Sequence, residues 1–247
     1  MSDLSWLTAR PVAHRGLHDA ASGIVENTPS AVDAAVRAGF AIEVDLQLSA
    51  DGVPMVFHDS TLERLTTAEG PLRARTAAQL QALPFRATAD RMMRLDDLLA
   101  RVDGRVPLII ELKSARTPAT ALAARAAARV AAYGGPAALM SFDPRLLAVV
   151  RREAPAVPRG IVAERNFEGE DEPPLGALRR LTLGHLLHWP RSRFQFVAYR
   201  VADLDALGPR MARRLGLPLL TWTVRTAADR ARAARLADQM IFEGFRP

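Results

Sequence analysis

The chain has 247 residues, of which 49% are hydrophobic and 24% charged, and its mean hydropathy is +0.01. This composition excludes a disordered chain, which combines low hydrophobicity with high net charge. The chain has no cysteine, so disulfides are excluded and a reducing compartment is consistent with its composition. The sequence shows no secretory signal and no transmembrane segment, so we expect a cytoplasmic protein.

The formal charge of +6 raises the question of a nucleic-acid partner. The 33 basic and 27 acidic residues are interspersed, and there is no basic stripe interleaved with aromatic residues. We therefore expect no nucleic-acid binding. Of the basic residues, 32 are arginine and one is lysine, Lys113, which indicates a position where a compact ammonium group cannot be exchanged for a guanidinium.

Apolar, β-rich segments alternate with Ala/Leu/Arg-rich helical patterns along the chain, as is typical of βα units around a parallel sheet. The predicted strands, in chain order, are 10–16, 41–48, 53–57, 106–113, 137–142, 159–163, 194–200, 218–224 and 240–243. The predicted helices are 29–38, 76–82, 95–102, 119–132, 144–153, 175–181, 202–215 and 227–236. Thr28 and Asp143 each precede a proline and are predicted helix N-caps.

Only the four residues 49–52 join the second and third predicted strands, so these strands form an antiparallel hairpin. If the turn centres between Asp51 and Gly52, Asp45 pairs with His58. Eight parallel strands remain, which predicts an α/β fold, a (β/α)8 TIM barrel with a β-hairpin and a small insertion after strand 2. We expect residues 1–247 to form a single catalytic domain, with the insertion at about 60–94.

Charged residues gather at the predicted strand ends, where barrel enzymes keep their chemistry. Glu43 and Asp45 lie two residues apart on one strand and therefore face the same way. Glu111 and Lys113 repeat this spacing on another strand. Buried carboxylates side by side need a cation, or else one of them must hold a proton. Hard oxygen ligands of this kind suit Mg²⁺ or Ca²⁺ better than Zn²⁺.

Two strand-end histidines, His14 and His58, are the predicted acid and base, because imidazole titrates near neutral pH. Asp59 follows His58 and is placed to orient it. Arg15 and Lys113 add positive charge, and a metal with two such cations suits an anion with several oxygens, of which phosphate is the obvious one. The other three histidines are interpreted as structural, and these are His18, His185 and His188.

An ordered set of motifs resembles the glycerophosphodiester phosphodiesterase family. The set comprises Ala-His-Arg-Gly at 13–16, Glu-Asn-Thr at 26–28, Ile-Glu-Val-Asp at 42–45, Asp-Gly at 51–52, Val-Phe-His-Asp at 56–59, Leu62, Arg64, Thr66, Glu-Leu-Lys at 111–113, Ser-Phe at 141–142 and Trp-Thr-Val at 222–224. The match runs over most of the chain and is densest from 13 to 66.

The resemblance implies a metal-dependent barrel enzyme of lipid metabolism that hydrolyses glycerophosphodiesters to sn-glycerol 3-phosphate and an alcohol. It makes His14 and His58 the acid–base pair, and Glu43, Asp45 and Glu111 the metal ligands. Four residues would bind the substrate, a small-molecule phosphodiester, and these are Arg15, Lys113, Phe142 and Trp222. Glu26 and Asp59 would have supporting roles.

The chain departs from the family pattern at Arg225, where asparagine is usual, and at Glu243, where the last strand commonly ends in Thr-Asp. We expect both at the pocket rim, where they affect alcohol specificity. The alternative function is a phospholipase-type phosphodiesterase or lyase acting on (lyso)phospholipids at the same site, which predicts an apolar patch near Trp6, Trp189 and Phe167. A non-enzymatic phosphate-binding protein is disfavoured by the intact histidines and carboxylates. The oligomeric state is left open by the sequence.

Overall fold

The computed structural model describes residues 3–114, 120–166 and 176–247. Eight parallel strands form a closed ring in the order β1, β2, β4, β5, β6, β7, β8 and β9, and β9 pairs with β1 to close it. The strands are β1 (Val12–Ala13), β2 (Ala41–Leu48), β3 (Pro54–Val56), β4 (Leu108–Leu112), β5 (Ala137–Ser141), β6 (Arg159–Ala163), β7 (Phe196–Arg200), β8 (Leu219–Val224) and β9 (Gln239–Phe242). The predicted (β/α)8 barrel is confirmed.

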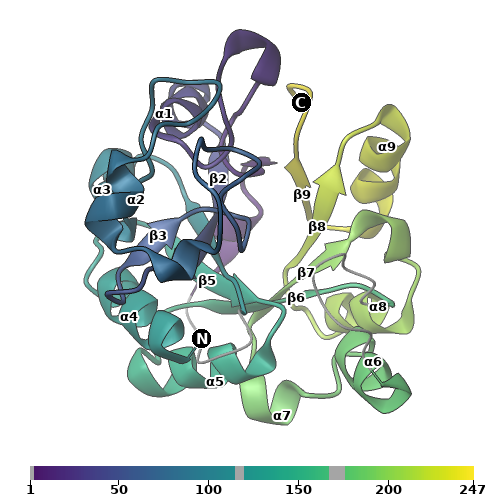
Figure 1. Cartoon of the computed structure of the whole chain (residues 1–247). Coiled ribbons are helices and arrows are strands. Elements are labelled where there is room, and N and C mark those ends of the chain that lie inside the picture. The colour runs from purple at the N-terminus through teal and green to yellow at the C-terminus, as the bar shows by residue number, and fades with distance from the viewer. Residues whose placement is uncertain (1–2, 115–119, 167–175) are drawn as a thin grey trace.

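Helices surround the ring of strands (Figure 1). The α-helices are α1 (Pro29–Ala38), α2 (Ala77–Ala82), α3 (Leu95–Val102), α4 (Thr120–Ala131), α5 (Pro144–Glu153), α6 (Ala177–Gly184), α7 (Trp189–Ser192), α8 (Leu207–Arg214) and α9 (Ala227–Leu236). Short 3₁₀ helices are η1 (Ser5–Leu7), η2 (Ala20–Ser22), η3 (Leu72–Ala74) and η4 (Val201–Asp203). Among the described residues, every helix is too short or too polar to span a lipid bilayer.

Helix boundaries follow local signals where the signals are strong. Helix α1 begins after Thr28 with a proline in its first turn and ends at Gly39, whose φ of 72° suits glycine. Thr28 does not cap the helix with its side chain as predicted, because its hydroxyl donates to the Val25 carbonyl oxygen, 2.7 Å away. Asp143 does cap α5, since its carboxylate accepts from the Arg145 amide at 2.8 Å.

Two helix predictions were wrong in detail. The segment 202–215, predicted as one helix, divides into η4 and α8, because Pro209 lacks an amide hydrogen and is tolerated only in a first helical turn. Helix α7 was not predicted, since four residues carry little periodic pattern. The predicted starts at Ala119 and Leu175 lie outside the described residues.

The predicted hairpin is confirmed, but its register is shifted by one residue. Leu46 pairs with Val56, and the Phe57 amide donates to the Asp45 carbonyl oxygen at 3.0 Å. Asp45 therefore lies opposite Phe57 rather than His58. The reason is a three-residue loop closed by Gly52, whose φ of 79° provides the left-handed residue that such loops require.

Buried apolar side chains form three clusters. One fills the barrel interior and includes Leu7, Ile109 and Phe196, whereas a larger one packs the outer faces of the strands against the helices. The third lies under the segment 60–94 and includes Phe57, Leu72 and Leu80. The insertion thus has a small core of its own, and its place within one catalytic domain stays a prediction.

Candidate active site

Three buried carboxylates converge inside the barrel. Glu43 and Asp45 lie on β2, and Asp45 is in register with Glu111 on β4. Each side chain can offer an oxygen within 4.8 Å of the others. The pleat explains this geometry, since residues 42, 44 and 46 pack outward against the helices while 43 and 45 face inward. The predicted carboxylate cluster is therefore present in the fold.

Two basic side chains, those of Lys113 and Arg15, contact this cluster. The Lys113 ammonium nitrogen Nζ is 2.9 Å from Asp45 Oδ1 and 2.7 Å from Glu111 Oε1. The Arg15 side-chain Nε lies 3.4 Å from Asp45 Oδ2, and the Arg15 backbone amide donates to Glu43 Oε2 at 3.0 Å. The single lysine of the chain thus bridges two carboxylates that parallel strands bring side by side.

Burial raises the pKa of Asp45, but the charges of Lys113 and Arg15 more than offset this effect and hold the pKa below its ordinary value. For Glu43, burial is again the largest influence, and the charges of Asp45 and Glu111 add to it, so its pKa is raised well above the ordinary value. Glu43 Oε1 is buried and has no hydrogen-bond partner among the described residues. The cluster thus carries an uncompensated carboxylate oxygen, and this all-oxygen donor set fits a hard divalent cation.

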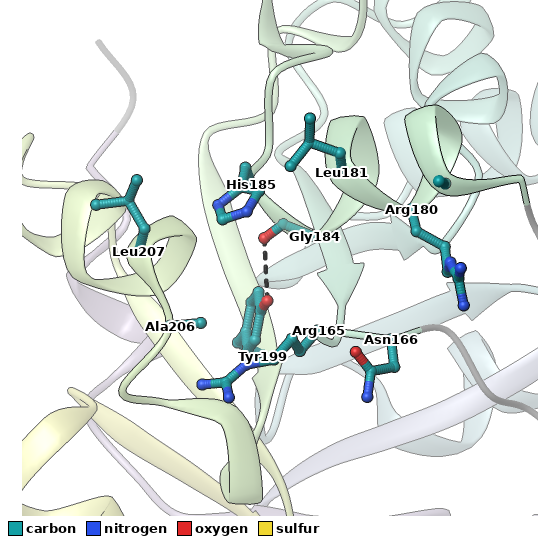
Figure 2. Close-up of a pocket in the computed structure, with 10 residues that line it drawn as sticks. Arg165, Asn166, Arg180, Leu181, Gly184, His185, Tyr199, Ala206 and Leu207 are labelled. Carbon is teal, nitrogen blue, oxygen red and sulfur yellow. Dashed lines mark hydrogen bonds between the residues drawn. The ribbon is translucent and has the colours of Figure 1, made fainter.

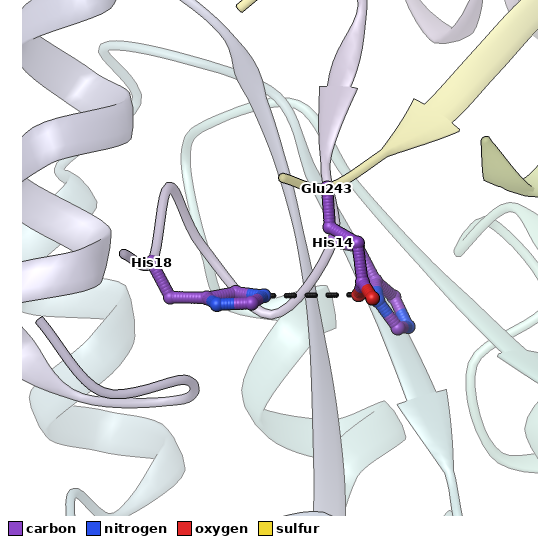
Figure 3. A group of neighbouring side chains, drawn as sticks. All are labelled: His14, His18 and Glu243. Carbon is purple, nitrogen blue, oxygen red and sulfur yellow. Dashed lines mark hydrogen bonds and ion pairs between the residues drawn. The ribbon is translucent and has the colours of Figure 1, made fainter. Parts of the chain in front are cut away.

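His14 is held by a residue from the far end of the chain. Its Nδ1 lies 2.5 Å from Glu243 Oε2, and its Nε2 lies 3.9 Å from Glu43 Oε2. Glu243 Oε1 also accepts from Arg225 Nε at 2.5 Å, and His18 Nε2 approaches Glu243 Oε2 to 3.7 Å (Figure 3). The imidazole is therefore anchored through Nδ1, which leaves Nε2 on the side of the carboxylates.

These contacts change the interpretation of two residues. Glu243 and Arg225 were expected at the pocket rim, but Glu243 touches the imidazole of His14 directly. His18 was interpreted as a structural histidine, yet it shares Glu243 with His14. The only sequence signal for Glu243 was its departure from the family pattern.

His58 has a similar arrangement built from residues close in sequence. Its Nδ1 lies 2.8 Å from Asp59 Oδ1, and Asp59 Oδ2 accepts from Arg64 Nε at 2.6 Å. Burial raises the pKa of Asp59, but the hydrogen bonds from His58 and Arg64 outweigh it and lower the pKa. This geometry fits the predicted orienting role of Asp59.

Glu26 links this second group to Arg15 beside the carboxylate cluster. Its carboxylate accepts from Arg64 Nη2 at 2.7 Å and from Arg15 Nη1 at 2.7 Å. Asn27, which was not among the predicted site residues, donates from Nδ2 to Asp45 Oδ2 at 2.9 Å. The Glu-Asn-Thr motif thus contacts both Arg15 and Asp45, and the supporting role of Glu26 stays a prediction.

Two backbone positions at the site lie in the left-handed region. Arg15 has a φ of 56° and Asn27 a φ of 58°, which costs an ordinary residue roughly 1–2 kcal/mol. The Asn27 amide donates to the Arg15 carbonyl oxygen at 2.9 Å. Strain of this kind persists where the surrounding contacts fix the backbone, as is common at functional sites.

Phe142 follows β5 and Trp222 lies on β8, and their rings meet edge to face with centroids 5.5 Å apart. Trp222 Nε1 donates to the Ala198 carbonyl oxygen at 3.1 Å. Both rings pack on the interior cluster and are partly buried. The two predicted pocket aromatics are therefore neighbours, whereas His185 and His188 lie away from the carboxylates around α6 and α7.

The fold and this site define a class of protein, a (β/α)8-barrel enzyme with a buried carboxylate cluster beside two carboxylate-bound histidines. Residues 14–244 match the model of the glycerophosphoryl diester phosphodiesterase family. The chain therefore belongs to this family.

Three relatives illustrate the range of similarity. Glycerophosphodiester phosphodiesterase 1 of Bos taurus is 43% identical over 74 residues, which are 29% of this chain and only 21% of that protein. YhdW of Bacillus subtilis (strain 168), named as a candidate glycerophosphodiester phosphodiesterase, is 28% identical over 231 residues, 88% of each chain. A phosphodiesterase of Oleispira antarctica, solved with the product sn-glycerol-3-phosphate, has a TM-score of 0.72 at 19% identity, over 94% of this chain and 91% of its own. At that identity the likeness supports the fold alone.

Proposed function

We propose that the chain hydrolyses glycerophosphodiesters to sn-glycerol 3-phosphate and an alcohol, with Mg²⁺ or Ca²⁺ as cofactor and with His14 and His58 as the general acid–base pair. The observation that carries the proposal is the buried carboxylate cluster. The basic side chains of Lys113 and Arg15 contact it, and beside it lie two histidines that are each held through Nδ1. Hydrolysis of a phosphodiester needs charge stabilisation on the phosphate oxygens and proton transfer at two further oxygens, and these groups provide for both.

Glu43, Asp45 and Glu111 would hold the divalent ion. The bound ion supplies Lewis acidity to the phosphate oxygens. The unpartnered Glu43 Oε1 supports this assignment, as does the close approach of the three carboxylates.

Arg15 and Lys113 would bind the remaining phosphate oxygens. Arg15 reaches Glu26 through Nη1 and approaches Asp45 through Nε, so its guanidinium is fixed before substrate arrives. Lys113 is held between Asp45 and Glu111. Phe142 and Trp222 would pack against the glycerol or the alcohol group.

One histidine would accept the proton of the entering oxygen, and the other would donate a proton to the leaving alkoxide. Because Glu243 and Asp59 each bind Nδ1, Nε2 is the atom left for proton transfer in both rings. The entering oxygen is either the substrate's own 2-hydroxyl, which gives a cyclic phosphate, or water. A substrate analogue that lacks this hydroxyl separates the two routes, because only direct attack by water still cleaves it.

The proposal is tested by following release of glycerol 3-phosphate from glycerophosphocholine with wild-type protein and with Glu43→Ala. We expect release by the wild type and a loss of at least about 100-fold in the variant, because its ligand set is incomplete. Glu153→Gln, on the exposed face of α5, is the matched control and should leave the rate unchanged. Equal rates for Glu43→Ala and the wild type would contradict the proposal.

A further inference from the structure

The exposed large apolar side chains of the described residues gather in one part of the molecule. They are Leu178, Leu181, Leu187, Trp189, Leu207, Met211 and Leu215, and we name them the α6–α8 face. Leu178 and Leu215 are 78% and 73% exposed. Scattered apolar residues are ordinary on a protein surface, whereas concentration on neighbouring elements indicates an interaction site.

Two of the helices that carry this face, α6 and α8, lie close together, and α7 packs on α5. The Gly208 Cα of α8 comes so near α6 that an added Cβ would lie 2.5 Å from the Gly184 carbonyl oxygen. A cavity of about 460 Å³ lies between the two helices, with Leu181 on one side and Leu207 on another (Figure 2). In Figure 1, α6, α7 and α8 occupy one side of the barrel, across from α1 to α3.

The described part of this face is rich in arginine, whereas the acidic stretch 168–172 before α6 lies outside the described residues. Between Gly176 and Leu217 the sequence has eight arginines and only two acidic residues, Asp203 and Asp205. Both aspartates approach Arg165. Across the described part of the chain, no side-chain hydrogen bond or ion pair engages five of these arginines, which are Arg179, Arg180, Arg191, Arg210 and Arg214.

We propose that the α6–α8 face docks on an anionic lipid surface. Leucine, methionine and tryptophan would enter the headgroup region, and the arginines would extend their charged ends to the lipid phosphates. The charge pattern disfavours a second copy of the chain, because a two-fold contact would bring unpaired arginines together with few acidic residues to neutralise them. This inference does not depend on the proposed hydrolysis.

The face runs along the side of the barrel: Leu207 lies near the carboxyl end of β7, whereas Trp189 and Leu215 precede the amino ends of β7 and β8. Arg165 follows the carboxyl end of β6 and lines the cavity beside Leu207. The carboxylate cluster and Lys113 also lie toward the carboxyl ends of their strands.

The test is co-sedimentation of the whole protein with two kinds of vesicle, phosphatidylcholine alone and phosphatidylcholine mixed with phosphatidylglycerol. We expect binding to the anionic vesicles, weakened by salt, and little binding to the neutral ones. Trp189 is 41% exposed, so its fluorescence should shift to the blue on binding, and Trp189→Phe should remove most of that shift.

Two pairs of variants test the face itself. Leu178→Glu with Leu215→Glu should lower binding at least tenfold, whereas the control Ala78→Glu with Ala228→Glu, on exposed positions of α2 and α9, should not. Arg179→Gln with Arg210→Gln should lower it by about fivefold for each charge removed, and the control Arg37→Gln with Arg73→Gln should not.

Circular dichroism and thermal unfolding of the face variants, compared with the wild type, check that they are folded. Failure of the wild type to bind anionic vesicles would overturn the proposal, and so would equal binding by both face variants and their controls. A concentration-dependent dimer that Leu178→Glu with Leu215→Glu abolishes, without vesicle binding by the wild type, would assign the face to self-association instead.

Discussion

The two site histidines are held by groups of the same design in different surroundings. In the His14 group (His14, Glu243 and Arg225) and in the His58 group (His58, Asp59 and Arg64), a carboxylate binds Nδ1 and its other oxygen accepts from an arginine. The His14 group ends at Arg225, which is 57% exposed.

The His58 group continues through Glu26 to Arg15 and so to the carboxylate cluster. A change in the His14 group should therefore affect proton transfer by His14 alone. A change in the His58 group should also disturb the residue proposed to bind phosphate. The predictions below test this difference.

The largest effect is expected from removing either imidazole. His14→Ala and His58→Ala should each lower kcat for glycerophosphocholine at least about 100-fold, a typical contribution of a general acid or base. His185→Ala, away from the carboxylates, is the matched control. Near-wild-type rates in both site variants would remove the acid–base assignment.

The second-largest effect is expected from Glu243 and Asp59, the carboxylates that bind the imidazole rings of His14 and His58. Glu243→Gln and Asp59→Asn should each lower kcat by about 10–100-fold, because the amide no longer fixes the imidazole tautomer. Only Asp59→Asn should also raise KM, since it releases Arg64 from a network that includes Arg15. Glu243→Asp should recover part of the lost rate. Identical KM values for Glu243→Gln and Asp59→Asn would contradict the distinction between the groups.

The arginines at the ends of the two groups should differ more modestly. Arg225→Ala should lower kcat by less than about fivefold, because exposed ion pairs contribute little. Arg64→Ala should instead raise KM, because Glu26 then pairs with Arg15 alone. Steady-state kinetics of both variants measure the difference, and a larger KM effect from Arg225→Ala would reverse the account.

A buried histidine without a carboxylate partner provides the contrast. His188 Nδ1 is 3.0 Å from Ser192 Oγ, and its buried Nε2 has no partner in the described part of the chain. Burial lowers its pKa to about 4.

As the pH falls, His188 therefore takes up a proton in the unfolded state near pH 6.5, but in the folded state only near pH 4. The stabilisation of the folded state by the neutral, buried ring is fully present above about pH 6.5. It is lost as the pH falls toward 4, by up to about 3 kcal/mol. Urea unfolding across this range should show a shallower pH dependence for His188→Phe than for the wild type. If the free energy of unfolding depended on pH in the same way in both proteins, His188 would be excluded as the source of this pH dependence.

The difference between the two groups also explains what could be predicted from the sequence. His58, Asp59 and Arg64 lie within seven positions, so their proximity follows from local order. His14 and Glu243 are separated by 229 positions, and only closure of the barrel by β9 and β1 brings them together. The carboxylates were predictable because a strand's alternation is local and parallel strands align their ends.

Other features depended on details that no local pattern specifies. The hairpin register was missed by one residue because the turn contains three residues rather than two. The partners of Asn27 depend on its left-handed backbone, which follows from the fold around it. Trp6, expected near an apolar patch, lies within η1 and packs instead on the interior cluster. Phe167 lies outside the described residues.

The central claim is that the buried carboxylates hold a divalent ion required for diester hydrolysis. Its most direct test is release of glycerol 3-phosphate from glycerophosphocholine by EDTA-treated protein, before and after Mg²⁺ or Ca²⁺ is restored. We expect no release by the treated protein and recovery with one of the ions, but no recovery in Glu43→Ala. Full activity of the EDTA-treated protein, with no metal detected in it by elemental analysis, would contradict the account.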